Sequence, residues 1–323
     1  MKAIRYFERR LLHSALLLVA VSLLSFAASQ LAPGSFLDEM KLNPQVSAHT
    51  LDSLRGQYGL DQPLPVRYFR WLKSAVAGNF GYSLAYKLPV RRLLGDRIGN
   101  TLLLGTAAMV FAWALALPLG IWSAYRPGKW IDRAGSGISM LLLATPELVL
   151  ALLLILFAAR SGTLPGGGMS SAQEQNSRWQ TAADVLRHLA LPALILALVA
   201  LPILLRHIRG AMLEAWNSPF VHAAKGHGIG DTRLLLRHAL PAACNPLISL
   251  FGLSLAGLVS GSFLVEVIMG WPGLGPLFLE AVYSRDFHVV VAIVMLFSVF
   301  LIVANLAADL LLYAADPRVR AEC

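Results

Sequence analysis

Cysteine and charge are both scarce in this chain, and each shortage excludes a class of protein. Only 2 of the 323 residues are cysteines, too few for a disulfide framework or a cysteine-based metal site. Charged residues make up 14% of the chain and apolar residues 57%, with a mean hydropathy of +0.63. These values lie outside the range of soluble enzymes of this length, so the composition indicates a membrane protein.

Catalytic motifs are also missing from the sequence. It contains no Gly-x-x-x-x-Gly-Lys-Ser/Thr phosphate-binding loop, no Gly-x-Ser-x-Gly nucleophile turn and no His-Glu-x-x-His zinc motif. Gly226, Gly228 and Gly230 alternate, but no strand precedes them and no lysine of the required kind follows, so they do not predict nucleotide binding. His222 and His227 do not have the spacing of metal ligands on one helix. We therefore expect a protein with no enzymatic activity, no cofactor and no metal.

Six long apolar runs account for the high hydropathy. They occupy about residues 11–31, 101–125, 135–158, 187–205, 246–269 and 289–313. A helix needs roughly 20 apolar residues to cross the ~30 Å hydrocarbon core of a bilayer, and these runs lack the alternation of barrel strands. The sequence predicts an all-α membrane protein with six transmembrane helices surrounded by membrane lipid.

Basic residues predict which side of the membrane each loop faces. Lys2, Arg5, Arg9 and Arg10 precede the first run, and such residues stay in the cytoplasm. No small-residue cleavage site follows that run, so we expect it to remain as an uncleaved span. Six spans then place both termini in the cytoplasm, together with the basic loop 206–244. This bias explains the net charge of +9 without a nucleic-acid partner.

The order of apolar and polar segments suggests three parts. Residues 1–32 form an N-terminal transmembrane helix, residues 33–98 an extracytoplasmic segment, and residues 99–323 a five-helix core that contains the loop 206–244. In the extracytoplasmic segment, a proline-rich turn precedes aromatic residues at helical spacing, which predicts an amphipathic helix packed on the membrane interface or on neighbouring spans. Residues 161–185, with three consecutive glycines, are expected to form a flexible outer loop.

The loop 206–244 contains the most informative pattern in the sequence. Its marked residues are His222, Ala223, Ala224, Gly228, Leu240 and Pro241. Alanines let a partner surface approach closely, glycine allows a turn that other residues avoid, and proline is best tolerated in the first turn of a helix. The pattern predicts two short helices joined at Gly228.

This spacing resembles the cytoplasmic EAA loop of ABC importer permeases: Glu-Ala-Ala, three residues, Gly, nine residues, a hydrophobic residue, any residue, Leu-Pro. His222 stands in place of the glutamate and His238 in place of the hydrophobic residue. The leading glutamate is commonly absent in the peptide-importer branch. The resemblance implies that the loop is a coupling helix that docks into an ATPase subunit.

Further motifs resemble the dipeptide, oligopeptide and nickel permeases along nearly the whole chain. They are Gly59-Leu60-Asp61 followed by Tyr68 and Trp71, Gly78-Asn79-Phe80-Gly81-Tyr82-Ser83, Glu266 to Gly275, Arg285-Asp286-Phe287 and Asp316-Pro317-Arg318. The resemblance implies a bacterial inner-membrane permease subunit that forms half of a pathway for peptides, nickel or similar small solutes. Its implied partners are a second homologous permease, two ABC ATPase subunits and an extracytoplasmic solute-binding protein.

Candidate residues for the pathway or a gate lie in the third and fifth runs. Glu147 follows Pro146, which is expected to kink its helix, and a carboxylate within a span faces a bundle interior or an aqueous path by default. It could contact a substrate amine, or it could pair locally. Glu266 precedes the turn Trp271-Pro272-Gly273, which could form a gate or a docking ledge, although backbone N–H groups could equally satisfy that carboxylate.

Two other functions remain open from the residues alone. A secondary transporter would show intramembrane charges or paired broken helices; Glu147 is a weak signal of this kind, and the sequence has no obvious inverted repeat. A non-conducting membrane assembly protein could keep an EAA-like loop without transporting anything. The sequence does not distinguish among cargoes, nor between a homodimer and a heterodimer of permeases.

Overall fold

The computed structural model describes residues 2–31, 56, 62–171 and 177–315. Two of the sequence motifs, Gly59-Leu60-Asp61 and Asp316-Pro317-Arg318, lie outside the described residues. The described elements are almost all helical, and the only strands among them form one two-stranded hairpin. The predicted all-α class is therefore confirmed.

Five helical segments in the described ranges are long and apolar enough to cross a membrane. They lie in α1 (Lys2–Leu31), α5 (Val90–Tyr125), α8 (Arg178–Trp216), the run Asp231–Ile268 and α14 (Phe287–Ala315). The run Asp231–Ile268 is made of α10 (Asp231–Leu234), a π-helical turn (Leu235–Ala239), α11 (Leu240–Gly261) and α12 (Phe263–Ile268). Each segment overlaps a predicted span.

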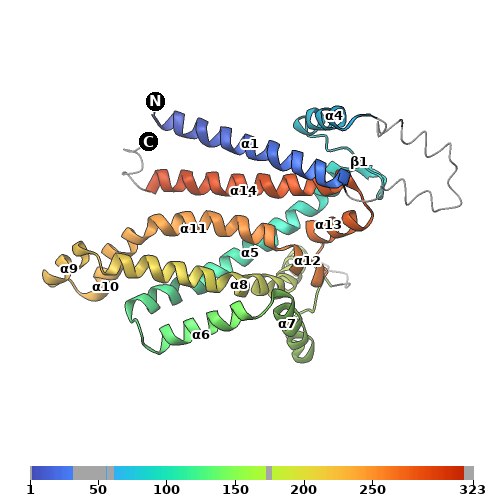
Figure 1. Cartoon of the computed structure of the whole chain (residues 1–323). Coiled ribbons are helices and arrows are strands. Elements are labelled where there is room, and N and C mark those ends of the chain that lie inside the picture. Colours follow the sequence, from blue (N-terminus) through green and yellow to red (C-terminus); the bar gives the residue numbers. More distant parts are fainter. Residues whose placement is uncertain (1, 32–55, 57–61, 172–176, 316–323) are drawn as a thin grey trace. The chain divides into compact units, whose positions relative to one another are not determined.

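The third predicted span, 135–158, is divided into two helices. α6 (Trp130–Ala144) and α7 (Glu147–Ser161) meet at an angle of 105°, and Figure 1 shows the bend between them. Thr145 has the extended backbone that a following proline imposes, and Pro146 provides no N–H to continue the helix. The expected kink is therefore a complete break, and the pair counts as a sixth span only if both helices are taken together.

Contacts divide the chain into two compact units, residues 3–100 with 273–299 and residues 101–272 with 300–323. The first unit is built around aromatic side chains from three helices. Phe26 of α1 packs edge-on against Tyr68 of α4 (Leu64–Val76) and against Phe287 of α14, with ring centroids 5.4 and 5.0 Å apart. The buried Trp71 joins them. The amphipathic helix expected in this part of the chain is therefore present, and its aromatics pack on neighbouring spans.

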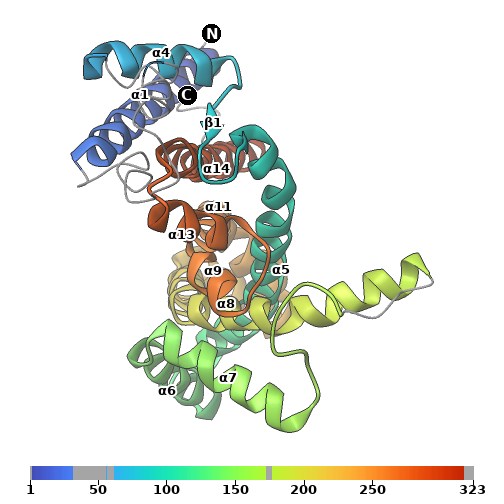
Figure 2. The same cartoon turned by 90° about the vertical axis from the view of Figure 1, so that its right-hand side faces the viewer.

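A small hairpin in the same unit is fixed to the start of α14. Strands β1 (Tyr82–Ser83) and β2 (Leu88–Pro89) pair antiparallel, and Figure 2 shows the hairpin beside α14. The Ser83 hydroxyl donates a hydrogen bond of 2.6 Å to the buried carboxylate of Asp286, and the Ala85 N–H donates one of 3.2 Å. This unit also contains α13 (Leu274–Tyr283) and the first part of α5.

The second unit is centred on α8, which packs against α6, α7, α11 and α12. Figure 1 shows α8 running between α11 and α6. Small residues bring the helices close: a Cβ added at Gly120 of α5 would lie 2.6 Å from Ile208 Cγ2, and one at Gly105 would lie 2.6 Å from Val259 Cγ2. Two clusters of buried aliphatic side chains fill this unit, one around Leu196 and Trp271 and one around Leu204 and Ile208.

Candidate functional site

The loop between α8 and α11 folds into a helical hairpin. α9 (Pro219–Gly226) begins after Ser218, and α10 begins at Asp231. Gly228 lies between them with φ +82°, a left-handed conformation that favours glycine. The Gly228 N–H donates to the Lys225 carbonyl at 3.0 Å, which closes the last turn of α9. The prediction of two short helices joined at Gly228 is confirmed.

The two faces of α9 differ sharply in burial. Val221 is 2% exposed and packs into the aliphatic cluster around Leu204 and Ile208, with Ala224 half-buried against the same cluster. Phe220 is 49% exposed, and His222 and Ala223 are also exposed. The two alanines of the motif therefore have different surroundings, because Ala224 packs against the protein and Ala223 points away from it.

The second half of the motif leads directly into α11. Pro241 lies in the first turn of α11, as expected. The π-helical turn Leu235–Ala239 precedes it, and such a turn accommodates one extra residue within a helix. Ala239 is fully buried and Leu240 packs against the same cluster as Val221. The loop is thus a compact extension of α8 and α11, called the coupling hairpin (residues 217–241) from here on.

Glu266 is fully buried, and the turn that follows it is well ordered by hydrogen bonds. The Ser262 hydroxyl donates to Glu266 Oε1 at 3.0 Å, and the Trp271 N–H donates to the Glu266 carbonyl at 2.9 Å. Gly270 makes this turn possible with φ +60°. The Trp271 side chain is fully buried, whereas Pro272 is exposed. Gly273 is the N-cap of α13.

Glu147 is the first residue of α7, immediately after the break at Pro146. Its side chain is half-buried, and its Oε1 atom is buried without a hydrogen-bond partner among the described residues. α7 packs against α12, the helix that carries Glu266. Within the described ranges, no group of three or more His, Cys, Asp or Glu side chains could hold a metal ion.

Comparison with known proteins identifies the family. The sequence pattern of the binding-protein-dependent transport system inner membrane component matches residues 116–321, and that of its N-terminal region matches residues 3–105. The chain belongs to this family. The permease is 35% identical over 316 residues to the oligopeptide transport system permease protein AppB of Bacillus subtilis, covering 97% of this chain and 98% of AppB.

Two further relatives extend the comparison. The glutathione transport system permease protein GsiC of Salmonella paratyphi A is 32% identical over 320 residues, covering 98% of this chain and 99% of GsiC. The fold is also that of a chain in an inward-facing structure of the MetNI methionine ABC transporter, with a TM-score of 0.54 at 23% identity over 69% of the permease and 96% of that chain.

Family membership and full-length similarity establish what kind of protein this is. The chain is the permease subunit of an ABC importer, a multi-pass inner membrane protein that works with ATPase subunits and a binding protein. No relative supports a secondary transporter or an assembly protein.

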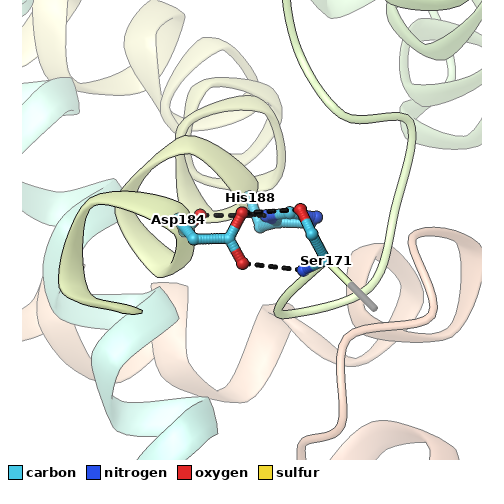
Figure 3. A network of polar contacts seen from close by, with 3 residues as sticks. All are labelled: Ser171, Asp184 and His188. Atoms are coloured by element: carbon cyan, nitrogen blue, oxygen red, sulfur yellow. Dashed lines mark hydrogen bonds and ion pairs between the residues drawn. The ribbon is translucent and has the colours of Figure 1, made fainter. Parts of the chain in front are cut away.

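The loop between α7 and α8 differs from its sequence prediction. Residues 161–185 were expected to be flexible, but their first part is held in place: the Gly168 N–H donates to the Met269 carbonyl at 2.7 Å. Figure 3 shows Ser171 against Asp184 of α8, where the Ser171 N–H and hydroxyl each donate to the carboxylate at 2.7 Å. His188 lies beside them, with Nδ1 2.9 Å from the Asp184 carbonyl. The two hydrogen bonds to this carboxylate restrict movement of the loop at Ser171.

One polar contact near the coupling hairpin was not predicted from sequence patterns. Arg209 of α8 forms two hydrogen bonds with Asp132 of α6, from Nε at 2.6 Å and from a terminal nitrogen at 2.9 Å. The two residues are far apart in the sequence and belong to no short motif, so only the packing of α6 on α8 reveals the pair.

Proposed function

We propose that the permease pairs with a second homologous permease and that two ATPase subunits bind the pair at the coupling hairpins. An extracytoplasmic binding protein delivers cargo from the opposite face. Both chain termini and the hairpin lie in the cytoplasm, which the basic residues before α1 and in the hairpin support. ATP hydrolysis takes place in the partner subunits, and this chain catalyses no reaction.

The division of the chain into an N-terminal span (1–32), an extracytoplasmic segment (33–98) and a permease core (99–323) is part of the proposal. It requires loop 33–98 and the hairpin to face opposite sides of the membrane. Labelling of cysteines placed at Asn79 and His227 with a membrane-impermeant maleimide tests it. We expect the Asn79→Cys thiol alone to react from outside intact cells, and reaction of the His227→Cys thiol from outside would overturn the orientation.

We propose that the cargo is a peptide. The support is that AppB is named for oligopeptide transport and GsiC for transport of glutathione, itself a small peptide, with both relatives matched over almost their full length. The permeases that the sequence resembles also include those for nickel and similar small solutes, so these solutes are the alternative cargo.

The coupling role rests on one observation: one face of α9 is buried and the other is exposed. Val221 and Ala224 fix one face of the helix to the core of the permease, while Ala223 and Phe220 present the other face to a partner. A force applied to the exposed face is passed on as a rigid-body displacement, because a closely packed core does not deform continuously. Gly228 shapes the turn and Leu240 and Pro241 the return into α11, while His222 belongs to the exposed part of α9.

A bulky residue on the exposed face tests this role directly. We expect Ala223→Trp to abolish co-purification of the ATPase subunits, because an indole would hold the partner surface away, while the permease itself keeps its fold. Ala77→Trp is the control: Ala77 is also an exposed alanine, but it is the C-cap of α4 and lies in the extracytoplasmic segment. Full ATPase binding by the Ala223→Trp permease would contradict the proposal.

We also propose that Glu147, Glu266, Trp271, Pro272 and Gly273 belong to the translocation pathway or its gate. Broken spans with polar groups at the break are common where transporters bind their cargo, and Glu147 occupies such a position at the α6–α7 break. Its unpaired buried oxygen favours a cationic ligand such as a peptide amine. Glu266 and Trp271, both buried beside a tight turn, favour a role in shaping the gate.

A further inference from the structure

The residues that flank the short connection between α5 and α6 (126–129) contact α8 just before the coupling hairpin and α10 within it. One contact is the ion pair of Asp132 in the first turn of α6 with Arg209 of α8, two turns before α8 ends. The Gly128 N–H donates a third hydrogen bond to the same carboxylate, at 2.8 Å. Asp132 is 6% exposed and the Arg209 side chain 35% exposed, so the pair is partly buried, and its bidentate geometry holds the two groups in a defined arrangement.

The other contacts come from Tyr125, the last residue of α5. Its hydroxyl donates to the Asp231 carboxylate at 3.2 Å, at the start of α10. Its ring packs edge-on against Trp216, the last residue of α8, with centroids 5.3 Å apart. The hairpin is therefore contacted where it leaves α8 and again where α10 begins.

Close packing of α5 and α6 against α8 adds to these contacts. A Cβ at Gly120 would lie 2.6 Å from Ile208 Cγ2, and one at Gly135 of α6 would lie 3.3 Å from Leu205 Cδ2. α5 and α6 thus each approach α8 closely within about one turn of Arg209. Such close-packed contacts move together rather than sliding past one another in small steps.

We infer that the Asp132–Arg209 pair, with Gly128 and Tyr125, is a second mechanical link that carries displacement of the coupling hairpin into α6 and the α6–α7 break. This inference rests on the proposed coupling function and adds a route to it. Movement of α9 reaches α8 and α11 through the chain itself, whereas it reaches α6 only across side-chain contacts. Asp132 and Arg209 are positioning residues, since they contact neither an ATPase nor cargo in the proposed arrangement.

The Asp132–Arg209 link matters because α6 leads to the break before α7. α6 ends at Ala144, and Thr145 and Pro146 separate it from Glu147 of α7. A shift at the N-terminus of α6 is therefore transmitted along fifteen helical residues to the break that contains the candidate cargo carboxylate. The link would allow nucleotide state at the hairpin to change the opening of the break.

A cysteine at the break reports the proposed movement. The parent protein carries Thr145→Cys with Cys244→Ser and Cys323→Ser, and it is reconstituted in nanodiscs with its ATPase subunits. We expect ATP to change the rate at which a small maleimide modifies this thiol by roughly fivefold or more, the lower end of typical allosteric couplings. Arg209→Gln is expected to remove most of this change while ATP hydrolysis continues.

Two further variants separate the link from folding defects. Arg206→Gln removes the same charge one turn earlier on α8, at an exposed position, and is expected to respond like the parent. Asp132→Asn combined with Arg209→Gln avoids an unpaired buried carboxylate, which would itself destabilise the fold, and is expected to lose the response while binding the ATPase subunits normally.

The possible results distinguish this inference from the coupling function on which it rests. An unchanged ATP response in Arg209→Gln and in the double variant would overturn the link and leave coupling through α8 and α11. Loss of ATPase binding in the double variant would also overturn it, because the pair would then only shape the docking surface. If the parent protein fails to bind ATPase subunits at all, the proposed coupling function itself is wrong.

Discussion

At the scale of single residues, two glycines two positions apart have opposite roles in the coupling hairpin. Gly228 has φ +82°, and Gly226 is the last residue of α9 without a positive φ. A Cβ at either position would have no atom within 4 Å. Backbone conformation alone therefore decides the effect of adding a methyl group.

We expect Gly228→Ala to lower the free energy of local unfolding of α9 by about 1–2 kcal/mol, the cost of a left-handed conformation for an L-residue. Gly226→Ala is expected to raise it by up to about 1 kcal/mol, because alanine favours a helix more than glycine does. Amide hydrogen exchange of α9 in the purified permease measures both. Equal effects of the two substitutions would show that φ does not control this turn.

Sequence reasoning succeeded at residues whose conformation is imposed locally. Gly228 and Pro241 lie where their backbone preferences predict, in a left-handed turn and in a first helical turn. The different burial of Ala223 and Ala224 was not predictable, because it depends on which side of α9 meets the cluster around Leu204 and Ile208. The coupling and pathway roles of the marked residues remain predictions.

At the scale of elements, the loop between α7 and α8 is more ordered than its glycines suggest. Its glycines and polar residues are typical of a flexible segment. Gly167 and Gly168 nevertheless allow the backbone to approach Met269. A Cβ at Gly167 would lie only 2.5 Å from the Met269 carbonyl oxygen. The same absence of a side chain that permits flexibility in an open loop permits close packing here. Only the fold distinguishes these two uses of glycine.

We expect Asp184→Asn to loosen this loop by about 1 kcal/mol, because an NH2 group replaces one of the two carboxylate oxygens that accept hydrogen bonds from Ser171. Limited proteolysis before residue 171 should then become faster. Thr181→Ala is a suitable comparison, since the Thr181 hydroxyl bonds only to the Ser177 carbonyl within the start of α8. Equal cleavage of the two variants and the unmodified permease would show that Asp184 does not hold the loop.

The α6–α7 break shows a different limit of sequence reasoning. Pro146 correctly marks a disruption, but a proline alone does not determine whether a helix bends or stops. Here the helix stops and the two helices meet at 105°. This happens because Thr145 has an extended backbone and α7 packs against α8 and α12. These contacts involve residues far away in the sequence.

At the scale of the whole molecule, the permease has a carboxylate at the α6–α7 break and no ATP-binding motif in its sequence. We expect the complex with its ATPase subunits and binding protein to import a labelled tripeptide with a free N-terminus. Glu147→Gln should lower this uptake by roughly tenfold, since a charge-assisted hydrogen bond is worth about 1.5–3 kcal/mol, without lowering ATP hydrolysis.

An N-acetylated form of the same tripeptide provides the comparison, because it carries no ammonium group for Glu147 to bind. Equal loss of uptake for both peptides in the Glu147→Gln complex would exclude recognition of the amine. The permease purified alone is expected to hydrolyse no ATP. Import of nickel but not of either peptide would overturn the proposed cargo.

The hydrogen bond between Ser83 and Asp286 joins residues separated by 203 positions, and this separation has a consequence for biogenesis. The first compact unit consists of residues 3–100 with 273–299, so its aromatic cluster and its hairpin cannot be completed until the ribosome has synthesised most of the chain. Residues 101–272 can assemble their aliphatic clusters earlier. A truncation before α13 would therefore leave α1 and α4 without their partners on α14, and such a nascent chain would be an early target for membrane proteases.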